Sequence, residues 1–112
     1  MLTIYHNPRC SKSRQTLALI EENNKEVAIV EYLKTPLNEA TIKSLLSLLS
    51  ISAIEMMRVK EVEFKEQNLA NADEEQLITA MVNTPKLMER PIVTNESKAI
   101  IGRPPENVLT LF

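Results

Sequence analysis

Several residue types are scarce in this chain of 112 residues, which has one cysteine, one histidine, one glycine and no tryptophan. A single cysteine excludes an internal disulfide and a cysteine-based zinc site. One histidine adds little to any other cluster of metal ligands, so we expect no bound metal. The single glycine, Gly102, leaves no glycine-rich phosphate loop of the nucleotide-binding kinds.

An excess of one charge sign and long apolar runs are also missing. The formal net charge is −2, which argues against nucleic-acid binding because that function usually needs a basic surface. No apolar run is long enough to span a bilayer, and no basic stretch followed by an apolar one indicates a secretory signal. We expect one domain over residues 1–112, monomeric and without membrane contact. A lone reactive thiol suits the reducing cytoplasm, which is the location we expect.

The surroundings of Cys10 are the most informative feature that is present. Leu2–Tyr5 is apolar and predicts a strand, and Ser11–Glu22 has helical spacing, so the thiol falls at the N-terminus of a helix. The first backbone N–H groups of a helix are unpaired and favour an anion. Three basic residues lie close by: Arg9, Lys12 and Arg14. This setting would stabilise a thiolate, the nucleophilic form of cysteine, and it differs from the apolar setting of a core cysteine.

Hydrophobic spacing and turn signals predict an α/β order of elements. In the first helix the buried face is expected at Leu17 and Ile20, with Ala18 or Leu19. The other predicted elements are a strand over 27–31, a helix capped by Asn38 with a stripe of Ile42, Leu45, Leu46 and Leu49, a short helix over 52–57, a helix capped by Asp73 and stopped by Pro85, strands over 90–94 and 98–101, and a final helix over 106–111. The polar segment 59–72 is predicted as a loop with a helical turn. The order is βαβ, then helices, then ββα, which favours a mixed four-stranded sheet flanked by helices.

Three arginines lie far from the cysteine in the sequence: Arg58, Arg90 and Arg103. The last two each precede a proline, so each of them lies at the end of a predicted element. The planar guanidinium group can hold two oxygens of a tetrahedral oxyanion at once. Scattered arginines are more often solvated surface residues, and spacing alone does not bring these three to Cys10.

The pattern Ile4-Tyr5-His6-Asn7-Pro8-x-Cys10-x-x-Ser13-Arg14 resembles the signature of the ArsC arsenate reductases, the glutaredoxin-coupled type with a thioredoxin-like fold. Further segments resemble the same family along essentially the whole chain. They are Glu31-Tyr32-Leu33-Lys34-Thr35-Pro36, the segment 51–58 that ends in Arg58, Arg90-Pro91-Ile92-Val93, and Gly102-Arg103-Pro104.

The resemblance implies a role for each matching residue. Cys10 would be the nucleophile, and His6 would lie near its thiolate and help to tune its pKa. Oxyanion binding and charge stabilisation would fall to Arg58, Arg90 and Arg103. Ser13 and Arg14 match positions in the anion-binding loop, and Pro91 matches the cis-proline of thioredoxin-like folds.

The resemblance also implies a mechanism in which the Cys10 thiolate attacks arsenate to form an arsenic–sulfur adduct. Glutathione, as co-substrate, displaces at the arsenic, and glutaredoxin resolves the mixed disulfide. No tightly bound cofactor is expected. The single cysteine agrees with resolution by an external thiol, since the chain has no second thiol of its own.

Three other classes of protein share part of this pattern. A Spx-like regulator that binds RNA polymerase usually carries a Cys-x-x-Cys switch, but Ser13 stands at the second position. A low-molecular-weight tyrosine phosphatase-like enzyme needs arginine six positions after the cysteine, where this chain has Thr16. A monothiol glutaredoxin-like oxidoreductase fits the Cys-x-x-Ser form and would need a glutathione site that the sequence does not reveal.

Overall fold

Four strands form one mixed sheet in the computed structural model, which describes residues 1–112. The spatial order is β2-β1-β3-β4, with β1 at Leu2–Tyr5, β2 at Val27–Val30, β3 at Ile92–Thr94 and β4 at Ala99–Ile101. β1 pairs in parallel with β2 and antiparallel with β3, and β3 pairs antiparallel with β4. The predicted mixed sheet, with its parallel βαβ unit and antiparallel hairpin, is therefore confirmed.

The chain divides into two units, and the second is inserted into the first. Unit 1 consists of Met1–Thr35 and Arg90–Phe112 and contains the sheet, helix α1 (Ser11–Glu22) and the 3₁₀ helix η4 (Pro105–Leu111). Unit 2, Pro36–Glu89, contains the remaining helices. The expectation that residues 1–112 make one domain stays a prediction.

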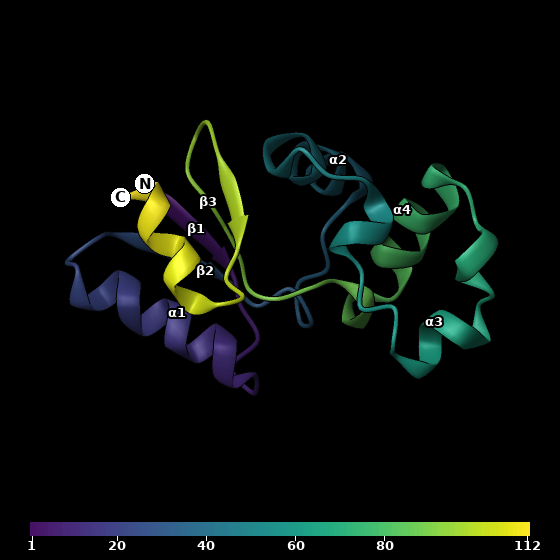
Figure 1. Ribbon diagram of the computed structural model, residues 1–112, viewed down its shortest axis with the longest axis horizontal. Helices are drawn as coiled ribbons and strands as arrows, with labels where there is room; N and C mark the ends of the chain where they lie inside the picture. Colours follow the sequence, from purple (N-terminus) through teal and green to yellow (C-terminus); the bar gives the residue numbers. More distant parts are fainter. The chain divides into compact units, whose positions relative to one another are not determined.

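The core of unit 1 lies between one face of the sheet and two helices. Figure 1 shows α1 and η4, coloured purple-blue and yellow, side by side against the strands. Apolar side chains from all of these elements meet there: Leu2, Ile4, Ile20, Val93, Val108 and Leu111. Fully burying one such side chain contributes roughly 1.5–3 kcal/mol, so this cluster fixes α1 on the sheet. The last helix was predicted as an α-helix and is instead a 3₁₀ helix that starts at a proline.

Helix α1 has the predicted bounds, but its buried face differs from the prediction. Ile20 is buried as expected, whereas Ala18 is exposed and Leu17 and Leu19 are half-buried. The other fully buried residues are polar, Ser13 and Thr16. A stripe chosen by hydrophobicity alone misses them because their hydroxyl groups find partners inside unit 1.

Unit 2 is helical, and its order of elements is α2 (Glu39–Leu49), η1 (Ala53–Met56), α3 (Val62–Glu66), η2 (Leu69–Asn71), α4 (Glu74–Asn83) and η3 (Pro85–Leu87). The side chains of Asn38 and Asp73 cap α2 and α4 as predicted. The predicted loop over 59–72 is too simple, because it contains both α3 and η2, and buried Phe64 and Leu69 anchor them. None of the helices in either unit has the length and apolar character needed to cross a membrane.

Candidate active site around Cys10

A tight turn joins β1 to α1 and carries the thiol. The backbone N–H of Cys10 donates to the carbonyl oxygen of Asn7 at 3.0 Å, and the carbonyl of Cys10 accepts from the backbone N–H of Arg14 at 3.0 Å. Cys10 is thus the N-cap residue of α1, with extended backbone geometry and no side-chain cap bond. The sulfur therefore lies where the first, unpaired N–H groups of the helix favour negative charge.

The electrostatic balance at Cys10 favours the thiolate. Burial raises the pKa of the Cys10 thiol and is the largest single effect, but several smaller effects together lower it by more, led by hydrogen bonding from the backbone N–H of Ser13 and the positive charge of Arg90. The backbone N–H of Lys12 and a hydrogen bond from the Arg90 side chain act in the same direction. The net pKa lies below the ordinary value of a cysteine, so a larger thiolate fraction exists at neutral pH.

His6 and Ser13 form a buried hydrogen-bonded pair beneath the turn. Nδ1 of His6 and Oγ of Ser13 are 2.6 Å apart, and Oγ also accepts from the backbone N–H of Asn7 at 3.1 Å. Burial lowers the pKa of His6, with the charge of Glu31 raising it and that of Arg14 lowering it. The Ser13 hydroxyl is thus engaged within the fold, and it is the backbone N–H of Ser13 that acts on the sulfur.

Two of the three predicted arginines lie in unit 1 and come together, Arg90 just before β3 and Arg103 just after β4. Arg90 contacts the thiol of Cys10, as described above, and Nη1 of Arg103 donates to the carbonyl oxygen of Arg90 at 3.5 Å. The pairing of Tyr5 with Ile92 explains the first contact, because it places the start of β3 beside the end of β1. The bonds that link each arginine to its proline, Arg90–Pro91 and Arg103–Pro104, are both cis.

Arg14 is exposed and donates from Nη1 to the carbonyl of Pro8 at 3.0 Å, which holds it over the turn.

Arg58 belongs to unit 2, so its approach to Cys10 stays a prediction. Within its own unit the guanidinium forms an ion pair with Glu61, with Nη2 and Oε1 2.5 Å apart. Lys86 also pairs with Glu61, at 3.5 Å. An oxyanion bound by Arg58 would have to compete with the Glu61 carboxylate.

Two residues that the sequence pattern does not mark as site residues, Thr16 and Gly102, also shape this site. Oγ1 of Thr16 donates to the carbonyl oxygen of Lys12 at 2.8 Å. A Cβ atom at Gly102 would lie 2.5 Å from Oγ1 of Thr16 and 2.8 Å from Cγ of Pro91. Only glycine therefore lets the segment before Arg103 approach α1 and Pro91 this closely. The only glycine of the chain was a signal that could have indicated such a close approach.

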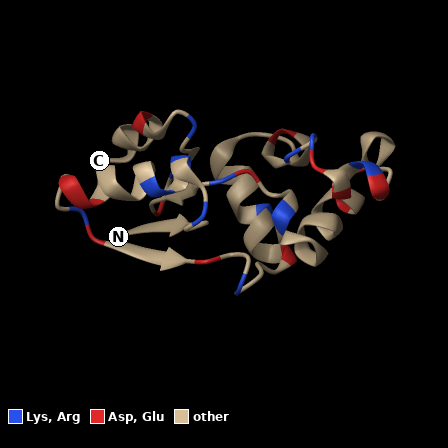
Figure 2. Ribbon diagram, turned by 90° about the horizontal axis from the view of Figure 1, so that it is seen from below, with Lys and Arg blue, Asp and Glu red and all other residues tan.

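The charges of α1 run opposite to the order that usually stabilises a helix. Lys12 and Arg14 lie in its first turn, and its only acidic residues, Glu21 and Glu22, lie at its C-terminal end; the basic and acidic colours of Figure 2 separate in the same way. Acidic residues near the N-terminus and basic ones near the C-terminus are the favourable order. The N-terminus of α1 is therefore strongly positive.

No group of three or more His, Cys, Asp and Glu side chains is arranged to hold a metal ion.

Comparison with known proteins gives consistent matches over the whole chain. A model of the ArsC family matches residues 5–111. The chain is 59% identical over 111 residues to the uncharacterised protein YfgD of Escherichia coli strain K12. The aligned region covers 96% of this chain and 93% of YfgD. It is 44% identical over 110 residues to the arsenate reductase of Neisseria meningitidis serogroup A, covering 96% and 94% of the two chains. The solved structure of the arsenate reductase from Vibrio cholerae is similar with a TM-score of 0.96 at 43% identity, over 99% of this chain and 97% of that one.

Proposed function

Because the chain belongs to the ArsC family, we propose that it reduces arsenate to arsenite with Cys10 as the nucleophile. The observation that carries this proposal is the environment of Cys10, at a positive helix N-terminus and in contact with Arg90, which lowers the pKa of the thiol. The same positive field that stabilises a thiolate also attracts an oxyanion. Relatives named arsenate reductase make arsenate the oxyanion to test first.

The proposed reaction begins when the Cys10 thiolate attacks arsenic and one arsenate oxygen leaves as water, so that an arsenic–sulfur bond forms. Arg90 and Arg103, together with Arg58, neutralise the charge on the remaining oxygens. Arginine suits this role because its fork binds two oxygens at once. Arg14, over the turn, adds positive charge to the same region.

The electrons for the reduction come from two thiols, and the chain has only one. Glutathione supplies the second: its sulfur bonds to arsenic with loss of water and then to the Cys10 sulfur. As this disulfide forms, both arsenic–sulfur bonds break; one of their two electron pairs forms the sulfur–sulfur bond, and the other stays on arsenic and converts As(V) to As(III). The products are arsenite and a Cys10–glutathione disulfide, which a glutaredoxin opens by thiol–disulfide exchange. The glutathione pool of the cytoplasm suits this cycle, so we place the protein there as part of the proposal.

The test is a coupled assay in which arsenate-dependent NADPH consumption is followed with glutathione, glutaredoxin and glutathione reductase. Cys10→Ser should abolish turnover. Ala at Arg58, Arg90 or Arg103 should lower the rate by about 10²–10³, the cost of losing one oxyanion-stabilising donor. Lys at these positions keeps the charge but loses the fork, so it should also impair the rate.

The matched control is Lys60→Ala, which removes an exposed cation of unit 2 that has no part in the proposal. It should leave the rate near wild type. Wild-type protein that consumes no NADPH with arsenate would refute the proposed activity. Full activity after Ala substitution at all three arginines, with Cys10→Ser inactive, would leave the nucleophile in place and refute the arginine assignment.

A further inference from the structure

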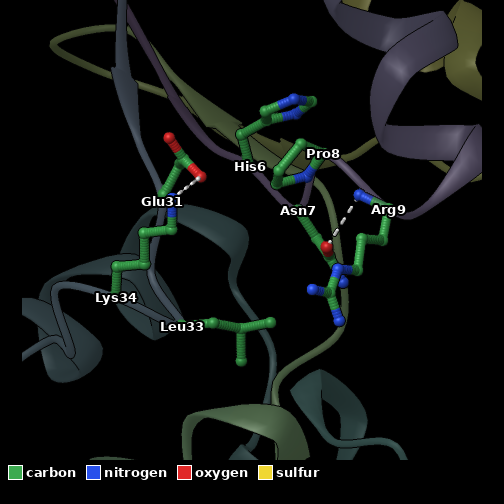
Figure 3. A pocket seen from close by; sticks show the side chains of 7 residues that line it. All are labelled: His6, Asn7, Pro8, Arg9, Glu31, Leu33 and Lys34. Carbon is green, nitrogen blue, oxygen red and sulfur yellow. Dashed lines mark hydrogen bonds and ion pairs between the residues drawn. The ribbon is translucent and has the colours of Figure 1, made fainter.

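A cavity of about 250 Å³ opens beside the Cys10 turn, entirely within unit 1. One side is formed by the loop before the thiol, including Asn7 and Arg9, and the other by the segment after β2, Glu31, Leu33 and Lys34. Figure 3 shows Arg9 on one side of this space and the Glu31–Lys34 pair on the other. The reaction steps above use none of these side chains.

The chemistry of this cavity suits a small molecule that carries both carboxylates and an amine. The Arg9 guanidinium makes no hydrogen bond or ion pair. The Lys34 side chain is 78% exposed, and its ammonium group has only a 3.5 Å pair with Glu31. Two such cations can each take a carboxylate, and the Glu31 carboxylate can take an ammonium group. Leu33 is 44% exposed and gives the ligand an apolar surface to cover.

We propose that this cavity binds the carboxylate-bearing end of the thiol co-substrate, a small peptide thiol of the glutathione class. The inference rests on the proposed function, which requires such a thiol from outside the chain. Drug-sized ligands occupy sites of roughly 300–1,000 Å³, so this smaller cavity accommodates one end of the peptide and leaves its thiol outside.

The position of the cavity allows that thiol to meet Cys10. Arg9 directly precedes Cys10, and the hydrogen bond from the Cys10 N–H to the Asn7 carbonyl closes both residues into one turn. Adjacent Cα atoms are about 3.8 Å apart, so a ligand held by Arg9 is anchored to the residue next to the thiol. The co-substrate would thus approach from the β2 side of the thiol, whereas the contacts of Arg90 come from the β3 side.

The test measures thiol–disulfide exchange at Cys10 without arsenate. The Cys10 thiolate attacks one sulfur of glutathione disulfide, the disulfide bond breaks, a Cys10–glutathione disulfide forms, and one glutathione thiolate leaves. The same exchange is run with hydroxyethyl disulfide, which has no charged groups. Mass spectrometry gives both rates, and their ratio cancels any change in the reactivity of Cys10 itself.

Wild-type protein should prefer glutathione disulfide. Arg9→Gln and Lys34→Gln should each lower the rate ratio by about threefold to tenfold, the effect of losing one partly screened charge-assisted hydrogen bond. The comparison variant is Lys12→Gln, which removes an exposed cation of the same turn that does not line the cavity. Because it only weakens the general positive field at Cys10, it should lower the ratio less than either cavity variant does.

Two outcomes would overturn the inference. One is a ratio that stays at the wild-type value in the Arg9 and Lys34 variants and in their double variant. The other is an equal loss in Lys12→Gln, because general attraction by the basic turn would then explain the preference. Since the assay contains no arsenate, either result is independent of whether the protein reduces arsenate.

Discussion

At the scale of single residues, the state of Cys10 depends on which groups lie next to its sulfur. Burial opposes the thiolate, and the opposing contributions of the Ser13 N–H and Arg90 decide the balance. We predict that Arg90→Ala raises the pKa of Cys10 and slows its alkylation by iodoacetamide at neutral pH. Alkylation rates measured against pH would give the apparent pKa of each variant.

The control for this experiment is Lys12→Gln, which removes an exposed charge near the turn but leaves the backbone N–H of residue 12 in place. It should raise the pKa less than Arg90→Ala does. An unchanged pKa in Arg90→Ala, or a wild-type pKa at or above about 8.5, the free-thiol value, would contradict the argument. Because the pKa of Cys10 is lower in the folded state than in the unfolded chain, its ionisation stabilises the fold fully above the unfolded pKa. This contribution is lost as pH falls through the folded-state pKa.

Site residues could be placed from the sequence where their surroundings come from neighbouring residues in the chain. Cys10 could be placed at a helix N-terminus because the strand, turn and helix that define that position are contiguous. The buried bond between His6 and Ser13 could not be predicted, since a serine in the first turn of a helix is usually an exposed cap residue. The contact of Arg90 with Cys10 depends on the pairing of β1 with β3, whose partners Tyr5 and Ile92 are 87 residues apart in the sequence.

At the scale of elements, α1 has basic residues at its N-terminus and acidic residues at its C-terminus, the order that destabilises a helix. We infer that this sequence favours anion binding at the N-terminus at some cost in helix stability. We predict that Lys12→Glu stabilises the folded protein by about 0.3–1 kcal/mol, since it places an acidic residue in the first helical turn. The same change should raise the KM for arsenate, because it lowers the positive field at the thiol. Urea unfolding and the coupled assay measure the two effects.

The matched variant is Glu22→Lys, which corrects the charge at the other end of α1, in the last turn. It should stabilise the protein by a similar amount and leave the KM unchanged. A parallel change of stability and KM in both variants would show that the charges of α1 do not act locally. Salt should weaken both stabilising effects because the side chains are exposed.

Element bounds were easier to predict than the faces that the elements bury. Helices α2 and α4 have caps and apolar stripes that agree with the sequence pattern, so propensity and packing point to the same structure. Segment 59–72 was underestimated because its short helices depend on a few anchors, such as Phe64, rather than on a repeating stripe. The buried face of α1 was predicted incorrectly for a similar reason. Thr16 can be buried there because Gly102, which lies against it, has no side chain.

At the scale of the whole molecule, the insertion of unit 2 into unit 1 makes it important to know whether the two units unfold together. Both tyrosines, Tyr5 and Tyr32, lie in unit 1, and the chain has no tryptophan, so intrinsic tyrosine fluorescence reports on unit 1 alone. Far-UV circular dichroism reports mainly on helices, several of which lie in unit 2. We predict that urea gives coincident transitions with both probes, as expected for one cooperative domain of this size.

A control variant sharpens that experiment. Leu45→Ala opens a cavity in the core of unit 2 and should cost about 2–5 kcal/mol. In a cooperative domain it shifts the fluorescence transition of unit 1 as much as the dichroism transition. Separate midpoints, or a fluorescence transition that ignores Leu45→Ala, would show that the two units unfold independently and that residues 1–112 are not a single domain.

The thioredoxin-like sheet expected from the family resemblance is confirmed, whereas the distribution of residues between two units was not predicted. Topology could be predicted because a parallel βαβ unit and an antiparallel hairpin leave few arrangements for four strands, and the family resemblance favoured one of them. Unit boundaries depend instead on where contacts are dense, and no glycine- or serine-rich linker marks the junctions at residues 35–36 and 89–90.

The single cysteine also determines how the partners of this protein can be found. A disulfide between Cys10 and another molecule cannot be opened by a second thiol of the chain, because there is none. Such an adduct lasts until an outside thiol attacks it. Protein recovered from cells whose thiols were alkylated at lysis would therefore retain, on Cys10, the last molecule it reacted with, and its mass would identify that molecule.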